Sequence, residues 1–329
     1  METNFVTADE YNHPPTNEPQ FNESAYFNFV DSTSEYATLI RMGNRVNEGH
    51  AEATVLVYLP GGAAALHFGR PTITTNDVFD AGGLRFDVIE PLQRMRCVYE
   101  GEANVLASGL DLADPKTALT TSPIEPVHID LEYENLIPVY GLSGGQSGIA
   151  GGEDTIATGH YQVPCRVVGT VSVGDRTIDV NGLGFRDHSW GPRKWQGPTY
   201  WRWVSCLCDD KNGFVGWLNR VGDNRPPGNG MVLRDGKFSL VRRVEVTSQY
   251  GPAPYYPESM EIDLHTDDRV YHASGRVRAC VPLRNRRDGV VARLAEVVNT
   301  YDFDGMEGHG IAEYHDIMLD GVPAGMHEV

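Results

Sequence analysis

Short β-rich segments separated by turn residues recur along most of the chain. Residues 52–59 end at Pro60-Gly61-Gly62, for example, and the β-rich residues 84–89 and 95–99 flank Glu90-Pro91. The chain has 36 glycines and 20 prolines, and its first two hundred residues show no apolar stripe at helical spacing. Short strands with Gly, Pro and Asp turns favour an antiparallel all-β fold. We expect roughly sixteen strands with little helix, or about two barrels or sandwiches of eight.

The charge balance excludes some classes of partner. The 329 residues carry 45 acidic against 27 basic side chains, a formal net charge of −18, which argues against non-specific nucleic-acid binding and docking on an anionic membrane. No apolar run approaches the ~20 residues that span a bilayer, so we expect no membrane insertion. The first residues lack the basic and apolar regions of a secretion signal, so we expect a cytoplasmic protein. The sequence does not decide whether the chain forms a homo-oligomer.

The five cysteines are an odd number, and without a secretion signal they are expected to be reduced thiols. Two of them, Cys206 and Cys208, are separated by one residue. This is the spacing of neither a zinc knuckle nor a redox pair. On a strand it places two small apolar side chains on one face.

The most distinctive stretch is 182–193, Gly-Leu-Gly-Phe-Arg-Asp-His-Ser-Trp-Gly-Pro-Arg. If it is extended, Arg186, His188 and Trp190 share one face of the strand, and Asp187 and Ser189 share the other. Its glycines suggest bulges or close approaches of the backbone to a ligand. The alternative is a structural corner, in which the aspartate pairs with a nearby arginine and the tryptophan fills the end of a barrel.

This stretch and the segment after it resemble the double lipocalin-like superfamily, which includes bacterial carotenoid 1,2-hydratases and fungal decalin-forming Diels–Alderases. The form Arg-Asp-His-Ser-Trp-Gly resembles a bacterial branch of that group most. Where hydratase-like members often carry an acid after Asp-His, this chain has Ser189. The matching positions are Gly182, Gly184, Asp187, His188, Trp190, Trp201, Trp203, Asp210, Gly213 and Arg220.

The resemblance implies two lipocalin-like β-barrel domains with a hydrophobic ligand near their junction. We place the N-terminal domain at residues 1–190 and the C-terminal domain at 191–329. The glycine-rich residues 141–156 are expected to form a flexible loop rather than a linker. Residues 1–20, which are polar and contain three prolines, are expected to form an extended surface arm.

An acid set among aromatic side chains can stay protonated near neutral pH and donate a proton to an alkene. Asp187 is the candidate donor, and His188 is the residue expected to orient it or relay the proton. A core histidine and an ion-paired aspartate remain the structural alternatives. The side chains expected to bind substrate are Trp190, Trp195, Tyr200, Trp201, Trp203, Trp217, Tyr255 and Glu313.

The sequence contains no dinucleotide fingerprint, no nucleophile elbow and no paired metal motif, so we expect no cofactor and no metal. Three functions stay open. The first is a cofactor-independent lyase or isomerase, hydratase- or cyclase-like, acting on a hydrophobic small molecule such as a terpenoid, steroid or polyketide. The second is a non-catalytic carrier of a similar ligand. The third is a structural or assembly protein whose aromatic cluster is only core.

Overall fold

The computed structural model describes residues 5–33, 35–142 and 157–328. Most of the expected loop at 141–156 lies outside these residues. The chain divides into two compact units. The first unit comprises Met1–Asp31, Glu35–Ala107 and Leu119–Lys194, and the second comprises residues 32–34, Ser108–Ala118 and Trp195–Val329.

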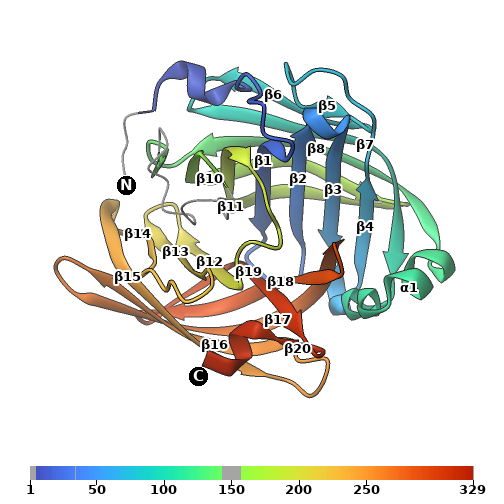
Figure 1. The fold of residues 1–329 in the computed structure, drawn as a ribbon. Coiled ribbons are helices and arrows are strands. Elements are labelled where there is room, and N and C mark those ends of the chain that lie inside the picture. Colours follow the sequence, from blue (N-terminus) through green and yellow to red (C-terminus); the bar gives the residue numbers. More distant parts are fainter. Residues whose placement is uncertain (1–4, 34, 143–156, 329) are drawn as a thin grey trace. The chain divides into compact units, whose positions relative to one another are not determined.

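The first unit is a closed antiparallel barrel, drawn mostly in blue to green in Figure 1. Pairing of β4 with β7, in which Ala64 faces Leu106, joins the ends of the sheet into a ring. In order around the ring, the eight strands among the described residues are β4 (Ala64–Gly69), β3 (His50–Tyr58), β2 (Ala37–Arg45), β1 (Phe21–Val30), β11 (Arg176–Pro192), β10 (Gly159–Val173), β8 (Ile124–Asn135) and β7 (Arg94–Leu106).

Short elements complete the first unit and its connections. The strands β6 (Leu84–Glu90) and β5 (Asp80–Ala81) extend the sheet beyond β7, and β9 (Tyr140–Leu142) pairs with β10. The α-helix in the described residues is α1 (Pro115–Thr121). The 3-10 turns are η1 (Thr7–Glu10), η2 (Val46–Glu48), η3 (Pro60–Gly62), η4 (Gly109–Ala113) and η6 (Ala324–Glu328).

The second unit is a second closed barrel, yellow to red in Figure 1. Its ring closes where β12 pairs with β19, with Tyr200 facing Asp316. Its strands in the described residues are β12 (Tyr200–Asp209), β13 (Asn212–Arg220), β14 (Asn229–Arg234), β15 (Lys237–Tyr250), β16 (Pro257–Thr266), β17 (Val270–Arg287), β18 (Val290–Phe303) and β19 (Met306–Leu319), with β20 (Val322–Pro323) added at the end.

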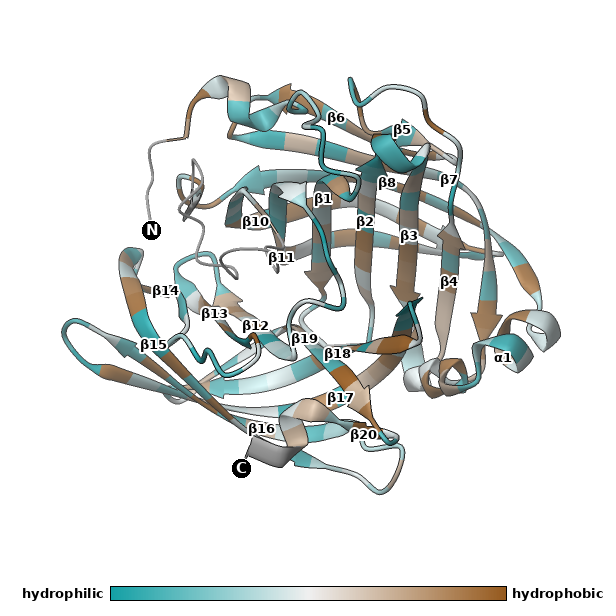
Figure 2. Cartoon of the chain, viewed as in Figure 1, coloured by the Kyte–Doolittle hydropathy of each residue, from teal (hydrophilic) through white to brown (hydrophobic). Residues whose placement is uncertain are grey.

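Alternation along the strands builds the two cores. In β1, Ala25, Phe27 and Phe29 point into the first barrel and belong to one buried apolar cluster. Figure 2 shows the resulting hydrophobic and hydrophilic bands along these strands. The second barrel has its own apolar cluster, which includes Val204 and Tyr314. Each barrel therefore holds a packed core of its own.

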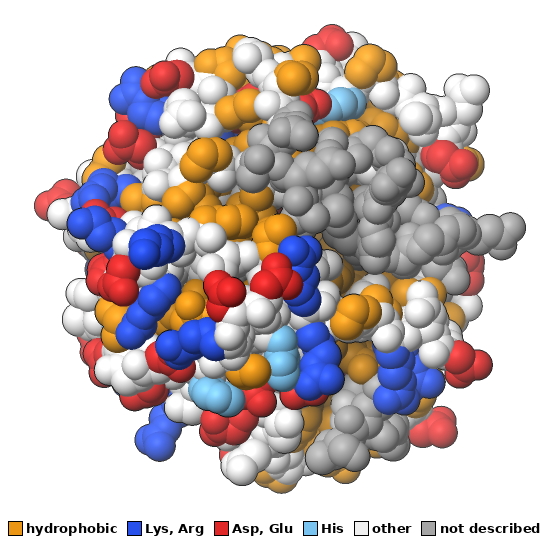
Figure 3. Space-filling view, turned by 90° about the vertical axis from the view of Figure 1, so that its left-hand side faces the viewer, with side chains coloured by type: hydrophobic (Ala, Val, Ile, Leu, Met, Phe, Trp, Pro, Cys, Tyr) orange, Lys and Arg blue, Asp and Glu red, His pale blue; other side chains and the backbone are white. Residues whose placement is uncertain are grey.

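The all-β prediction is confirmed: strands make up 66% of the structure and helices 8%. The described residues form twenty strands, more than the roughly sixteen expected, because short strands such as β5, β9 and β20 have no sequence signal of their own. Among the described residues, no helix has the length and apolar character needed to cross a membrane. On the face drawn in Figure 3, acidic and basic side chains are interspersed.

Candidate functional site

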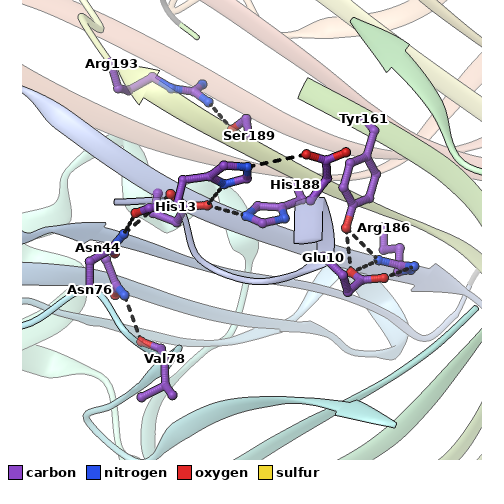
Figure 4. Close-up of polar contacts among 12 residues, drawn as sticks. Glu10, His13, Asn44, Asn76, Val78, Tyr161, Arg186, His188, Ser189 and Arg193 are labelled. Atoms are coloured by element: carbon purple, nitrogen blue, oxygen red, sulfur yellow. Dashed lines mark hydrogen bonds and ion pairs between the residues drawn. The ribbon is translucent and has the colours of Figure 1, made fainter. Parts of the chain in front are cut away.

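A polar cluster lies inside the first barrel, where β1 and β11 pair. His188 faces Ala25 in the β1–β11 ladder and Tyr161 in the β10–β11 ladder, and both of these neighbours belong to the barrel core. Arg186, His188 and Trp190 therefore project inward, as the alternation in the sequence predicts. The labelled residues in Figure 4 come from β11 and the residue after it, from β10 and β2, from the segment before β1 and from the segment between β4 and β5.

The centre of the cluster is the carboxylate of Glu23, which is fully buried. His188 Nε2 lies 2.6 Å from Glu23 Oε1, and His13 Nδ1 lies 2.9 Å from the same oxygen. Asn76 donates to the carbonyl oxygen of His13 at 2.8 Å and holds that segment in place. Two imidazole rings thus meet at one carboxylate oxygen.

The charge state of Glu23 follows from these contacts. Burial on its own raises the pKa of this carboxyl, but hydrogen bonds from His13 and His188 outweigh burial and hold the pKa below its ordinary value. Because a carboxylate only accepts hydrogen bonds, each imidazole presents an N–H to it. The Nε2 atom of His13 then points away from Glu23, and it lies 3.8 Å from Asp9 Oδ1.

Aromatic rings enclose the two histidines. His13 stacks on Trp190 with 3.9 Å between ring centroids and 14° between ring planes. The ring of His188 meets the edges of Tyr161 and Phe79 at 5.5 and 5.8 Å. His188 is buried, whereas the side chain of His13 keeps 21% of its surface exposed. His13 is therefore the imidazole that a molecule from solvent can reach.

An ion pair lies beside this cluster. Arg186 donates to both carboxylate oxygens of Glu10, at 2.8 and 3.0 Å, and Tyr161 donates to Glu10 at 2.5 Å. Burial disfavours the charge on Arg186, but attraction to Tyr161 and Glu10 is stronger and raises its pKa. Residues 1–20 were expected to form a surface arm, and this is wrong for Glu10, which is buried because it neutralises Arg186 inside the barrel.

Asp187 lies on the opposite face of β11. Its carboxylate is 3.7 Å from His160 Nε2, and its side chain is 21% exposed. Arg186 pairs with Glu10 rather than with this neighbour, because adjacent residues of a strand point to opposite faces. Ser189, on the same face as Asp187, accepts a hydrogen bond from Arg193 at 2.8 Å. The strand therefore separates Asp187 from both His188 and Trp190.

The same cluster offers ligands for a metal ion. In the described part of the chain, His13, Glu23 and His188 place one ligand atom each within 4.8 Å of one another. Two imidazoles and a carboxylate suit zinc and related divalent ions. The sequence shows no such set because its three members come from segments far apart along the chain. A second set comprises the exposed Glu245 and the half-buried Asp263 and His265.

Several predicted substrate-binding residues form an aromatic stack on the outer face of the second barrel. Trp201 stacks on His315, with centroids 3.8 Å apart and planes at 8°, and its indole N–H donates to Glu313 at 2.5 Å. Trp217 and Trp195 lie 5.5 and 5.8 Å from Trp201. Trp203 is buried and faces Trp217 across the β12–β13 ladder. Five of the predicted substrate-binding residues therefore lie together, namely Trp195, Trp201, Trp203, Trp217 and Glu313.

A pocket of about 140 Å³ opens at one end of the second barrel. Tyr200 lines it, together with Arg202 and Tyr250. Arg202 donates to Asp316 at 3.0 Å and to the Tyr250 hydroxyl at 3.1 Å. Burial raises the pKa of Tyr250, so its hydroxyl stays protonated. Tyr255 uses its carbonyl oxygen to accept a hydrogen bond from Arg293 at 2.7 Å.

Sequence reasoning missed Glu10, His13 and Glu23. The burial of Glu23 could have been predicted from the sequence. In an extended segment it lies on the same face as the apolar residues Ala25, Phe27 and Phe29, which point into the barrel. Glu10 and His13 lie in a polar, proline-rich segment without periodicity, so nothing in the sequence points them at the barrel. His188 and Trp190 were predicted, and the structure brings both into the cluster.

Solved structures share this fold across nearly the whole chain. A candidate AttH (NE1406) from Nitrosomonas europaea has 15% identity and a TM-score of 0.57, covering 92% of this chain and 96% of that one. CghA with Sch210972 has 11% identity and a TM-score of 0.58, covering 93% and 90%. Kievitone hydratase from Nectria haematococca has 11% identity and a TM-score of 0.57, covering 94% and 92%. These likenesses confirm the double lipocalin-like fold.

Sequence comparison gives the family. No curated protein matches this chain significantly by sequence. Residues 7–318 match the domain of unknown function DUF7064, and this range includes every residue of the cluster around Glu23, the strands of the first barrel and all but the end of the second barrel. The chain therefore belongs to the DUF7064 family.

Proposed function

We propose that the chain is a cofactor-independent lyase or isomerase that transfers protons to and from a hydrophobic small molecule. The observation that carries this proposal is the meeting of two imidazoles at one buried carboxylate, Glu23. Buried charges are costly, and a site that keeps one next to two titratable rings suits acid–base chemistry. Trp190 and Phe79 make the surroundings apolar enough for a hydrophobic substrate.

His13 is the residue that moves the proton in this mechanism. Glu23 holds its Nδ1–H, so Nε2 is left for the substrate. As an imidazolium, His13 donates the Nε2 proton to an alkene carbon, and the carboxylates of Glu23 and Asp9 lie beside its charge. The neutral His13 then takes a proton back, either from a neighbouring carbon of the cationic intermediate, as in an isomerase, or from a water molecule as it adds to the cation, as in a hydratase. Aromatic faces stabilise such a cation by roughly 0.5–2 kcal/mol each.

The other residues have supporting roles in this proposal. His188 holds Glu23 from the buried side and is a positioning residue. Asp187 stays a second candidate acid, with His160 as its partner on the other face of β11. Among the proteins with the same fold, kievitone hydratase supports the reaction class by analogy through its name, and CghA was solved with Sch210972. Neither identifies a substrate for this chain.

A deuterium-exchange experiment tests the proposal. Small molecules released from the denatured protein are identified by mass spectrometry, and the native protein is then incubated with them in D₂O. Proton transfer predicts deuterium bound to carbon in the recovered compound. His13→Asn should slow this exchange by about 10²–10⁴-fold. His128→Asn, at an exposed histidine of the first barrel, is the matched control and should exchange normally.

The remaining outcomes separate the alternatives. If deuterium exchange were lost in Asp187→Asn but not in His13→Asn, the proton donor would be Asp187 rather than His13. Loss on chelator treatment, with recovery on adding zinc, would make His13, Glu23 and His188 a metal site instead. A compound that co-purifies but shows no exchange would favour a carrier. The pocket in the second barrel, at about 140 Å³, is smaller than the roughly 300 Å³ of ordinary ligand sites, so it does not by itself favour a carrier.

A further inference from the structure

Two thiols lie on the inner face of β12 in the second barrel. Cys206 belongs to the buried apolar cluster of that barrel, and Cys208 packs against the same cluster. Residues i and i+2 of a strand point the same way, so both side chains face inward at one end of the strand. This pair lies in the second unit and is separate from the cluster around Glu23.

The two sulfur atoms meet over a glycine of the neighbouring strand. A Cβ atom built on Gly308 of β19 would lie 2.5 Å from Cys206 Sγ and 2.8 Å from Cys208 Sγ. The absence of a side chain at this position leaves room for both sulfur atoms. The thiols are hydrogen-bonded to each other, and Cys208 also donates to the carbonyl oxygen of Met306 at 3.8 Å. The pair is thus oriented toward one point before any ligand arrives.

Cys206 and Cys208 differ in accessibility and acidity. Cys206 is buried, and burial raises its pKa. Cys208 is only partly buried, and the hydrogen bond from Cys206 lowers its pKa, outweighing burial and the negative charge of Asp209, which both raise it. A thiolate is the nucleophile and the metal ligand. Cys208 is therefore the first thiol to react, and Cys206 is positioned to follow.

We propose that Cys206 and Cys208 form a dithiol site that binds thiophilic species, namely soft metal cations and trivalent arsenicals, with both sulfur atoms at once. Soft ligands such as thiolates select such ions. With an arsenic(III) oxide, each thiol forms one As–S bond, and the two thiol protons leave with the oxide oxygen as one water molecule. No oxidation state changes. Two ligands held at one point bind far more tightly than one, by about 10²-fold or more.

The other three cysteines do not form a second dithiol site that would compete for the same ligands. Cys97, Cys165 and Cys280 are buried. Burial raises the pKa of Cys165 and of Cys280 to about 12 and raises that of Cys97 strongly. They therefore stay as unreactive thiols while the protein is folded.

The test treats the full, reduced chain with phenylarsine oxide and measures intact mass under native conditions. We expect one phenylarsenic group per chain, gained with loss of one water and removed by a small dithiol. Cys206→Ser and Cys208→Ser should each weaken capture by about 10²-fold or more. Cys97→Ser is the matched control, a buried thiol in the other barrel, and should keep full capture.

Two results would overturn the proposal. One is the absence of an adduct on the wild-type chain, and the other is full capture by Cys206→Ser. Thermal melting of each variant shows whether it is folded, and Cys206→Ala, which places no hydroxyl in the core, replaces Cys206→Ser if that variant melts early. A further variant, Gly308→Ala, introduces a methyl group that would clash with both sulfur atoms, and it should also reduce capture of the arsenical.

Discussion

Burial distinguishes two carboxylates that sit close to the same strand. The side chains of Glu10 and Arg186 are only 1% and 2% exposed, so their pair is desolvated. Asp187 keeps 21% of its side chain exposed, and its contact with His160 is 3.7 Å long. Removing one member of a buried pair leaves the other charge uncompensated, whereas weak exposed pairs contribute little.

We predict that Glu10→Gln lowers the free energy of unfolding by about 3–5 kcal/mol, because Arg186 is left as a buried charge. Asp187→Asn, the matched control at the residue next to Arg186 in β11, should cost less than about 1 kcal/mol. Urea denaturation followed by circular dichroism measures both. A larger loss in Asp187→Asn than in Glu10→Gln would show that Asp187, not Glu10, is the structural carboxylate.

The lowered pKa of Glu23 gives a prediction about pH. The contribution of a group whose folded pKa is depressed is present above its unfolded pKa, ordinarily 4.5 for this residue, and is lost as pH falls through the folded value. The wild-type chain should therefore lose stability below about pH 4.5, and Glu23→Gln should lose less over the same range. Denaturation midpoints measured from neutral to acid pH test this. Equal slopes for the two proteins would contradict it.

At the scale of a single element, β11 shows what a sequence pattern can and cannot predict. Its alternation correctly placed Arg186, His188 and Trp190 on one face, because the two-residue period of a strand depends on local geometry alone. The partners of those side chains follow from pairing with strands far away in sequence. Glu10 and Glu23 therefore could not be assigned to Arg186 and His188 before the fold was known.

Two glycines of β11, Gly182 and Gly184, give a further prediction. A Cβ on Gly184 would lie 1.9 Å from the carbonyl oxygen of Asn28 on β1, whereas one on Gly182 would meet its nearest atom at 3.4 Å. Gly184→Ala should thus push β1 and β11 apart and cost about 1–3 kcal/mol or more, and Gly182→Ala should be nearly neutral. Thermal melting compares the pair. Equal melting points would show that the strands shift to accept the methyl group.

For the whole molecule, turn spacing predicted an all-β chain with little helix, arranged as about two barrels or sandwiches, and the family resemblance carried by residues 182–193 and the segment after them implied two barrels. Ring closure was not predictable, because the pairings of β4 with β7 and of β12 with β19 join segments distant in the chain. Trp195, Trp201 and Trp217 were predicted to bind substrate together with Trp190, but the structure stacks the first three in the second barrel and places Trp190 in the first. The sequence alone gave no register for any of these contacts.

The contact between Glu10 and Arg186 also affects the order in which the first barrel can fold. These residues are 176 positions apart. During synthesis, Glu10 emerges before Arg186 and remains hydrated until β11 has been made. Contacts between distant residues require costly loop closure and slow folding. On the ribosome, the barrel can complete its buried charge pair only after Arg186 appears, so Glu10, made 176 residues before its partner, is among the last residues to reach its native place.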